Sequence, residues 1–194
     1  AFLAGGGEVL MEPLYLGLQR LGIAAPNALQ IGEGAAYVVV EREEHARARE
    51  ARVHGVIRGY GSAFEPPERE AQLVHGSADA VRRALEGALA DAGIDASEVD
   101  AVCSSHGGLE VIDQSERQAI ALVFGENVRV AAPKRLFGET FGAAGALGLS
   151  AALAWMQGAP VAPLLSGNAE GPVRTVAVVS VGFYGNASAI IVSA

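Results

Sequence analysis

The chain has 194 residues, about half of them apolar, and a formal net charge of −8. This length is enough for one domain with a sizeable core, and the acidic balance argues against a nucleic-acid surface, which needs clustered lysine and arginine. The single cysteine, Cys103, excludes an internal disulfide and favours a cytoplasmic setting, and no apolar run reaches the ~20 residues of a membrane span.

The first sixty residues predict short strands and one helix. Phe2–Ala4 is an apolar stretch before three glycines and predicts a strand. The leucines of Met11–Leu21 recur at helical spacing. Ala35–Glu41 is rich in β-branched residues and predicts a strand, as does Val53–Tyr60. The charged run between these two strands predicts a solvated turn or a short helix.

The rest of the chain alternates between helix and strand patterns. Gly76–Ala92 is the clearest helix, with an apolar stripe, Ser77 as its N-cap and Gly93 as its stop. A second helix is expected from Asp113, as its cap, to Phe124. Strands are expected at 99–105 and 128–133, a helix from Thr140 or Gly142 to Gly158, and a closing hairpin at 174–194. Such alternation favours one α/β unit with a mostly parallel sheet covered by helices.

Four stretches resemble, in order, motifs of one known family. They are "FLAGGGE" at 2–8, "GEGAAYVVVEREEHARARE" at 32–50, "PKRLFGETFGAAGALG" at 133–148 and "VSVGFYGNASAIIV" at 179–192. Together they are similar to the C-terminal half of a β-ketoacyl synthase, one of the thiolase-fold condensing enzymes. The resemblance implies a thiolase-like layered α/β fold with a mostly parallel five-stranded sheet. It also implies that residues 1–41 end the N-terminal half and that residues 42–194 form the C-terminal half.

The chemistry that the resemblance implies is acyl transfer to a cysteine, followed by decarboxylative Claisen condensation with malonyl acyl carrier protein. Family members use a Cys-His-His triad supported by a lysine, and no cofactor is expected. The nucleophilic cysteine belongs to the N-terminal half, so this chain alone lacks it. Cys103 is expected to be a packed core thiol. No His/Cys pair recurs at the separation of metal ligands, so no metal is expected either.

Lys134 aligns with the family's lysine, and Glu139 stands where the resemblance implies the second histidine. That histidine donates a hydrogen bond to the thioester oxygen as enolate charge develops, which is usually the largest catalytic contribution. An ionised Glu139 donates nothing and repels the enolate by about 4 kcal/mol at 4 Å and an effective dielectric of 20. A Glu139 kept protonated by burial could donate instead. The remaining interpretation is a carboxylate that stabilises a helix N-terminus.

Two neighbouring residues compete for the position of the first histidine. His106 is the only histidine in "VCSSHGGLE". An alignment on Asp113 and Glu116, however, places the catalytic position on Ser105, one residue earlier. In the closing loop the resemblance implies that Phe183, beside Gly182, gates the acyl pocket and contributes a backbone N–H to an oxyanion hole.

Three functions remain open. The favoured one is a chain-length-factor-like subunit of fatty acid or polyketide (polyene) biosynthesis, which shapes the acyl tunnel beside an active ketosynthase. The second is a divergent β-ketoacyl synthase that condenses acyl chains when joined to its N-terminal half. The third is a non-catalytic thiolase-fold scaffold.

The partners implied are the N-terminal ketosynthase half, a second ketosynthase-like subunit in a homo- or heterodimer, and acyl carrier protein. Neither nucleic acid nor a membrane is among them.

Overall fold

Two separate sheets organise the chain in the computed structural model, which describes residues 1–24, 29–159 and 162–194. The larger sheet has six strands in the order β3-β8-β7-β4-β5-β6. Its strands are β3 (Val56–Phe64), β4 (Ala101–Cys103), β5 (Arg129–Ala131), β6 (Leu164–Ser166), β7 (Thr175–Val181) and β8 (Asn186–Ser193). The smaller sheet is the antiparallel pair of β1 (Phe2–Glu8) and β2 (Gly34–Val40).

The α/β class is confirmed, but the expected mostly parallel, five-stranded sheet is wrong in strand number and direction. Within the described residues only the β4–β5 and β4–β7 pairs run parallel. The tight hairpin makes β7 and β8 antiparallel, since a short turn reverses the chain. β3 then lies antiparallel to β8, and β6 lies antiparallel to β5. Alternation of helix and strand therefore predicted the centre of this sheet and not its edges.

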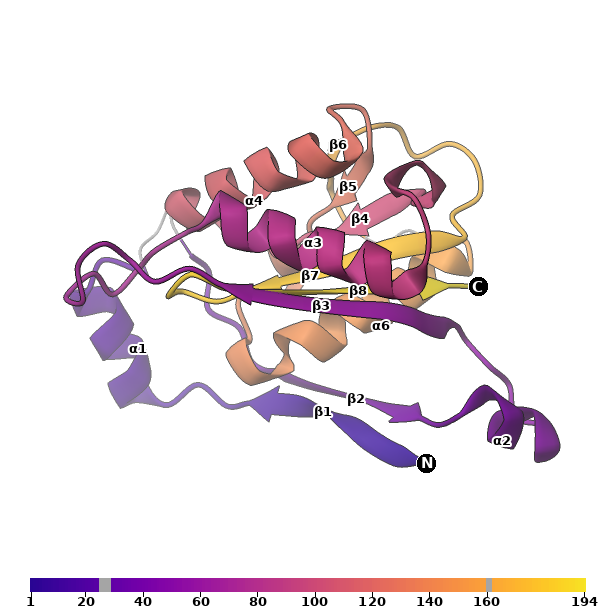
Figure 1. Cartoon of the computed structure of the whole chain (residues 1–194). Coiled ribbons are helices and arrows are strands. Elements are labelled where there is room, and N and C mark those ends of the chain that lie inside the picture. Colours follow the sequence, from indigo (N-terminus) through magenta and orange to yellow (C-terminus); the bar gives the residue numbers. More distant parts are fainter. Residues whose placement is uncertain (25–28, 160–161) are drawn as a thin grey trace.

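Helices cover both faces of the larger sheet, and the smaller sheet adds a further layer (Figure 1). Along β7, Ala177 and Val179 pack in the core cluster that contains α3 (Ala78–Ala92) and α4 (Glu110–Phe124). The alternating residues Val176 and Val178 pack in the cluster of α6 (Ala144–Met156). On its other side α6 contacts β1 and β2. The layers are thus α3/α4, six-stranded sheet, α6, and the β1–β2 pair.

The predicted limits of α3 are confirmed, whereas those of α4 need a correction. Ser77 accepts a hydrogen bond from the Ala80 N–H, and Gly93 ends α3 in the left-handed region. α4 begins at Glu110 rather than at Asp113. Asp113 is not a cap, because its carboxylate accepts hydrogen bonds from the loop that precedes α4.

The remaining elements are short. They are α1 (Glu12–Arg20), α2 (Glu43–Ala48), the 3-10 turn η1 (Ala96–Glu98), α5 (Lys134–Phe137) and the 3-10 turn η2 (Phe141–Ala143). The expected helix from residue 140 to 158 is thus divided into η2 and α6. No helix in the described ranges is both long and apolar enough to cross a membrane.

Glycines let the first forty residues approach the turn that leads into α6. A Cβ on Gly6 of β1 would overlap the carbonyl oxygen of Gly142, and one on Gly32 would overlap that of Phe137. Both positions therefore require the absence of a side chain. Segments far apart in sequence are in this way held in backbone contact.

A similar close approach joins β3 to α3 and generates a prediction. A Cβ on Gly61 would overlap the carbonyl oxygen of Ala84, so Gly61→Ala should lower the free energy of unfolding by about 1–3 kcal/mol through overpacking. Gly87 lies across the same contact, where a new Cβ would be 3.5 Å from Gly61 Cα, an ordinary separation. Gly87→Ala should therefore be neutral or stabilising. Urea denaturation of both variants tests this, and equal effects would contradict the packing.

Candidate functional site

The polar residues singled out in the sequence gather at one edge of the larger sheet. Ser105 follows the end of β4, and Lys134 follows the end of β5. Because β4 and β5 are parallel neighbours, their carboxyl ends lie side by side at the same edge. The fold thereby brings together two side chains that lie 29 positions apart in the sequence.

Lys134 makes a buried ion pair with Glu139. Its Nζ donates to Glu139 Oε2 at 2.6 Å and to Ser105 Oγ at 2.8 Å. Lys134 is 8% exposed and Glu139 3%, so water does not satisfy either charge. The other carboxylate oxygen of Glu139 accepts the backbone N–H of Phe141 at 2.8 Å. Both oxygens of Glu139 therefore act as acceptors, the arrangement of an ionised carboxylate.

The backbone of Glu139 is fixed as firmly as its side chain. Its N–H donates to the carbonyl of Gln30 at 2.7 Å, and its carbonyl accepts the N–H of Gly32 at 2.9 Å. Gly138, with a φ of +78°, supplies the left-handed backbone that the turn requires. The side chain is consequently directed at Lys134 by a turn that has little freedom.

Ser105 contacts Lys134, but no neighbouring group acts as a base that would make its hydroxyl a nucleophile. Its Oγ accepts hydrogen bonds from Lys134 and, at 3.3 Å, from the backbone N–H of Val181. Lys134 is already a donor to both Ser105 and Glu139, so it is not free to take the proton of the hydroxyl. This cluster can hold charge in place, but it presents no general base to Ser105.

His106 belongs to a separate contact. Its Nδ1 lies 3.0 Å from Glu116 Oε2, an ion-pair distance whose direction does not fit a hydrogen bond, and its Nε2 has no partner among the described residues. Burial lowers the pKa of His106, but the adjacent carboxylate of Glu116 and the charge of Asp113 outweigh it and raise the pKa overall. Of the two residues considered for the first histidine, the structure brings Ser105, not His106, to Lys134 and Glu139.

The carboxylates of α4 organise the loop that carries Ser105. Glu116 Oε1 accepts the Ser105 N–H at 2.7 Å. Asp113 accepts the N–H groups of Gly107 and Gly108 at 3.0 and 2.9 Å. Sequence reasoning used Asp113 as a helix cap and Asp113 and Glu116 as alignment marks, and nothing in the sequence around them indicated that they would hold the loop before α4.

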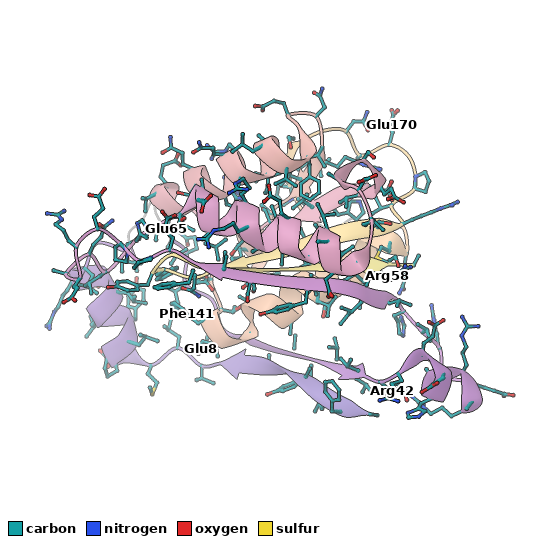
Figure 2. The ribbon with its side chains drawn as sticks, viewed as in Figure 1. Glu8, Arg42, Arg58, Glu65, Phe141 and Glu170 are labelled. Carbon is teal, nitrogen blue, oxygen red and sulfur yellow. The ribbon has the colours of Figure 1, made fainter. Side chains whose placement is uncertain are left out.

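The closing loop places Phe183 against Phe141, a residue that the sequence did not single out. Their rings meet edge to face, with centroids 5.9 Å apart and an interplanar angle of 72°, and both pack on the cluster around Leu18 and Leu29. Gly182 leaves no space for a Cβ, because the Asn186 side chain occupies it. Figure 2 shows Phe141 toward the same end of the molecule as Glu8 and Glu65, away from Arg42.

Backbone contacts from another segment hold this loop. The His75 N–H donates to the carbonyl of Phe183 at 2.7 Å, and the Glu65 N–H donates to the carbonyl of Gly185 at 3.0 Å. Both donors lie between β3 and α3, and neither was recognised in the sequence, since their contribution comes from the backbone. Phe183 is thus held at a defined place beside the polar cluster.

Two further features complete the surroundings. Cys103 is buried, and burial raises the pKa of its thiol to about 12, so the prediction of an inert core thiol is confirmed. A pocket of about 530 Å³ opens beside Lys134 and is lined by Gln30, Ile31, Gly107, Gly108 and residues 134–138. Space for a ligand therefore reaches the polar cluster.

Comparisons with known proteins point to one family. Residues 54–168 match the model of the β-ketoacyl synthase C-terminal domain. The ketoacyl synthase beta subunit of the tetracenomycin polyketide synthase of Streptomyces glaucescens is 35% identical over 143 residues, 73% of this chain and 34% of that protein. The 3-oxoacyl-(acyl-carrier-protein) synthase 2 of Coxiella burnetii is 31% identical over 176 residues, 76% of this chain and 40% of that protein.

A solved structure gives the same result. The ishigamide ketosynthase/chain length factor matches with a TM-score of 0.85 and 30% identity, over 98% of this chain and 53% of that chain. The chain thus spans about a third to two fifths of the curated relatives and about half of the solved chain.

The buried ion pair generates a prediction about stability. Lys134→Met leaves Glu139 as an unpaired buried carboxylate and should lower the free energy of unfolding by about 3–5 kcal/mol. Removing both charges, with Lys134→Met and Glu139→Gln together, should cost less than the single change. Chemical denaturation measures the difference and, as for the Gly61 and Gly87 variants, is carried out on the protein joined to its expected N-terminal half.

An exposed pair supplies the control. Arg47 and Glu43 form a solvent-exposed ion pair on α2, so Arg47→Met should change the free energy of unfolding by no more than about 0.5 kcal/mol. A double variant at least as unstable as Lys134→Met would contradict the assignment of a buried charge pair.

Proposed function

The chain belongs to the β-ketoacyl synthase family, whose C-terminal domain it matches, and on this premise we propose that it is part of a chain-length-factor-like subunit. Such a subunit pairs with an active ketosynthase in polyketide or fatty acid biosynthesis and shapes the tunnel that holds the growing acyl chain. It does not itself perform the decarboxylative Claisen condensation.

The observation that carries this proposal is that both carboxylate oxygens of Glu139 accept hydrogen bonds. Condensation requires a donor at the thioester oxygen, where negative charge develops, and loss of one such donor typically costs about 10²–10³ in rate. Glu139 offers acceptors only, and two of the three N–H groups of the one ammonium nearby, on Lys134, already donate to Glu139 and Ser105. Ser105, at the aligned position of the first histidine, is a weak donor and no base.

Two features of the site, the buried Lys134 and the position of Phe183, favour a second function, that of an active β-ketoacyl synthase. Lys134 is buried at the end of β5, and Phe183 lies beside the cluster in an ordered closing loop. An active β-ketoacyl synthase that takes its nucleophilic cysteine from an N-terminal half would need both features. We place this function second because it leaves Glu139 unexplained.

An N-terminal half is proposed as the partner that completes the fold, with residues 1–41 as its end and 42–194 as the C-terminal half. α6 has no charged residue, and Ser150 is its only polar side chain. A helix that is apolar on all sides belongs in a core, yet Leu147, Leu153 and Trp155 are only half-buried. Beside α6, a pocket of about 660 Å³ has Leu149, Leu153 and Val192 among its lining residues.

The outer sheet gives the same support. Phe2, Leu3, Tyr37 and Val39 of the β1–β2 pair are 65%, 66%, 56% and 64% exposed. Contiguous apolar surface of this kind marks an interface. We propose that the N-terminal half covers both surfaces, that the joined unit dimerises with a ketosynthase, and that acyl carrier protein delivers the substrate.

The central prediction concerns catalysis by the protein joined to its N-terminal half. Alone, it should release no carbon dioxide from malonyl acyl carrier protein, because the carboxylate of Glu139 stands where the developing enolate needs a donor. Mixed with an active ketosynthase, it should support chain extension beyond what the ketosynthase achieves by itself. Radiolabelled carbon dioxide and product mass measure the two outcomes. Release by the protein alone would establish the second function, and inactivity in both assays would establish the scaffold.

A further prediction concerns residues 1–194 expressed by themselves. With α6 and the β1–β2 sheet uncovered, this polypeptide should aggregate, or should bind a hydrophobic dye and melt without a sharp transition. Co-expression with the N-terminal half should restore a cooperative transition. A soluble monomer that melts sharply in isolation would show that nothing needs to cover these surfaces.

A further inference from the structure

Two buried ion pairs meet at Ser105. Its hydroxyl accepts from Lys134, the cation of the first pair with Glu139. Its backbone N–H donates to Glu116 Oε1 at 2.7 Å, and Glu116 Oε2 lies 3.0 Å from His106 Nδ1. A continuous chain of polar contacts therefore runs from His106 to Glu139.

In the second pair, two buried carboxylates act on one histidine. Glu116 is fully buried, and Asp113, one turn earlier on α4, is 2% exposed. The other charged group that acts on His106 from α4 is Arg117, which lies 57% exposed at the surface. Beyond Ser105, on α5, the charge of Lys134 is matched by Glu139. The ring of His106, 1% exposed, is thus the buried cation available to Glu116.

We propose that protonated His106 is the anchor of Glu116 and thereby a pH-responsive positioning residue for Ser105 and Lys134. When the ring loses its proton, Glu116 becomes a buried carboxylate without a cation. Such a group is strongly destabilising until it moves toward water. Its movement releases the Ser105 N–H and loosens the loop that holds the hydroxyl against Lys134.

The direction of the pH dependence follows from the raised pKa of His106. Burial acts to lower this pKa, but the adjacent carboxylate of Glu116 and the charge of Asp113 raise it above its usual 6.5. The stabilisation is complete below the pKa of the unfolded chain, about 6.5, and is lost as the pH rises through the higher folded value. The loop at 104–109 is therefore tightest under mildly acidic conditions. This inference does not depend on whether the protein condenses acyl chains.

Hydrogen exchange of the protein with its N-terminal half tests the proposal. Protection factors, which are corrected for the intrinsic effect of pH on exchange, are measured for peptides that cover 104–109 between about pH 6 and pH 9. Protection of this loop should fall about threefold or more across the range. Protection of α6, which packs on the face of the larger sheet opposite to α4, should stay constant.

Two variants separate a titrating anchor from a merely structural residue. His106→Gln keeps a polar side chain without a titratable charge and should give low loop protection that does not change with pH. Glu116→Gln keeps an acceptor for Ser105 and removes the need for a cation, so it should also abolish the pH step. His45→Gln, at an exposed histidine of α2, should leave the step intact.

The outcomes that overturn the proposal are a flat wild-type profile or an unchanged pH step in His106→Gln. If neither variant folds, the wild-type comparison of the loop with α6 decides alone. A fall in protection that includes 104–109 and spares α6 then supports the anchor, and a parallel fall in α6 excludes it.

Discussion

A lysine ammonium buried beside a carboxylate is the constraint on which this site depends. Neither charge can remain inside the protein alone, because an unpaired buried charge costs several kcal/mol. The Lys134–Glu139 pair thus requires the turn at 138–143, the end of β5 and the loop after β4 to keep their relative positions. Three segments that lie far apart in the sequence are thereby held around one polar cluster.

Much of the fold followed from local signals in the sequence. The caps of α3 and the glycine after α4 mark those helices because short-range hydrogen bonding and backbone freedom determine such ends. At the edges of the larger sheet, the direction of β3 and the presence of β6 did not follow, because both depend on contacts between distant segments. β6 is an example: it has three residues, and only its pairing with β5 makes it a strand.

Alignment with the family motif on Asp113 and Glu116 placed Ser105 at the position of the first histidine, with His106 as the competing candidate. The fold brings Ser105, Lys134 and Glu139 together and leaves His106 in a separate contact. The sequence could not show that Lys134 would neutralise Glu139, since that depends on the direction of two side chains after folding. It also gave no reason to select His75 or Phe141, which act through a backbone N–H and through the shape of a ring.

The glycine contacts between Gly6 and Gly142, and between Gly32 and Phe137, have a consequence for how such proteins can be recombined. The turn that presents Glu139 packs on the backbone of the first forty residues. The turn and these residues therefore depend on each other, although they lie in different layers. A crossover at residue 41 would place the turn against another strand, and any side chain at the position of Gly6 or Gly32 would displace it. An exchange that carries the stretch from Phe2 onward together with the ion pair keeps these contacts.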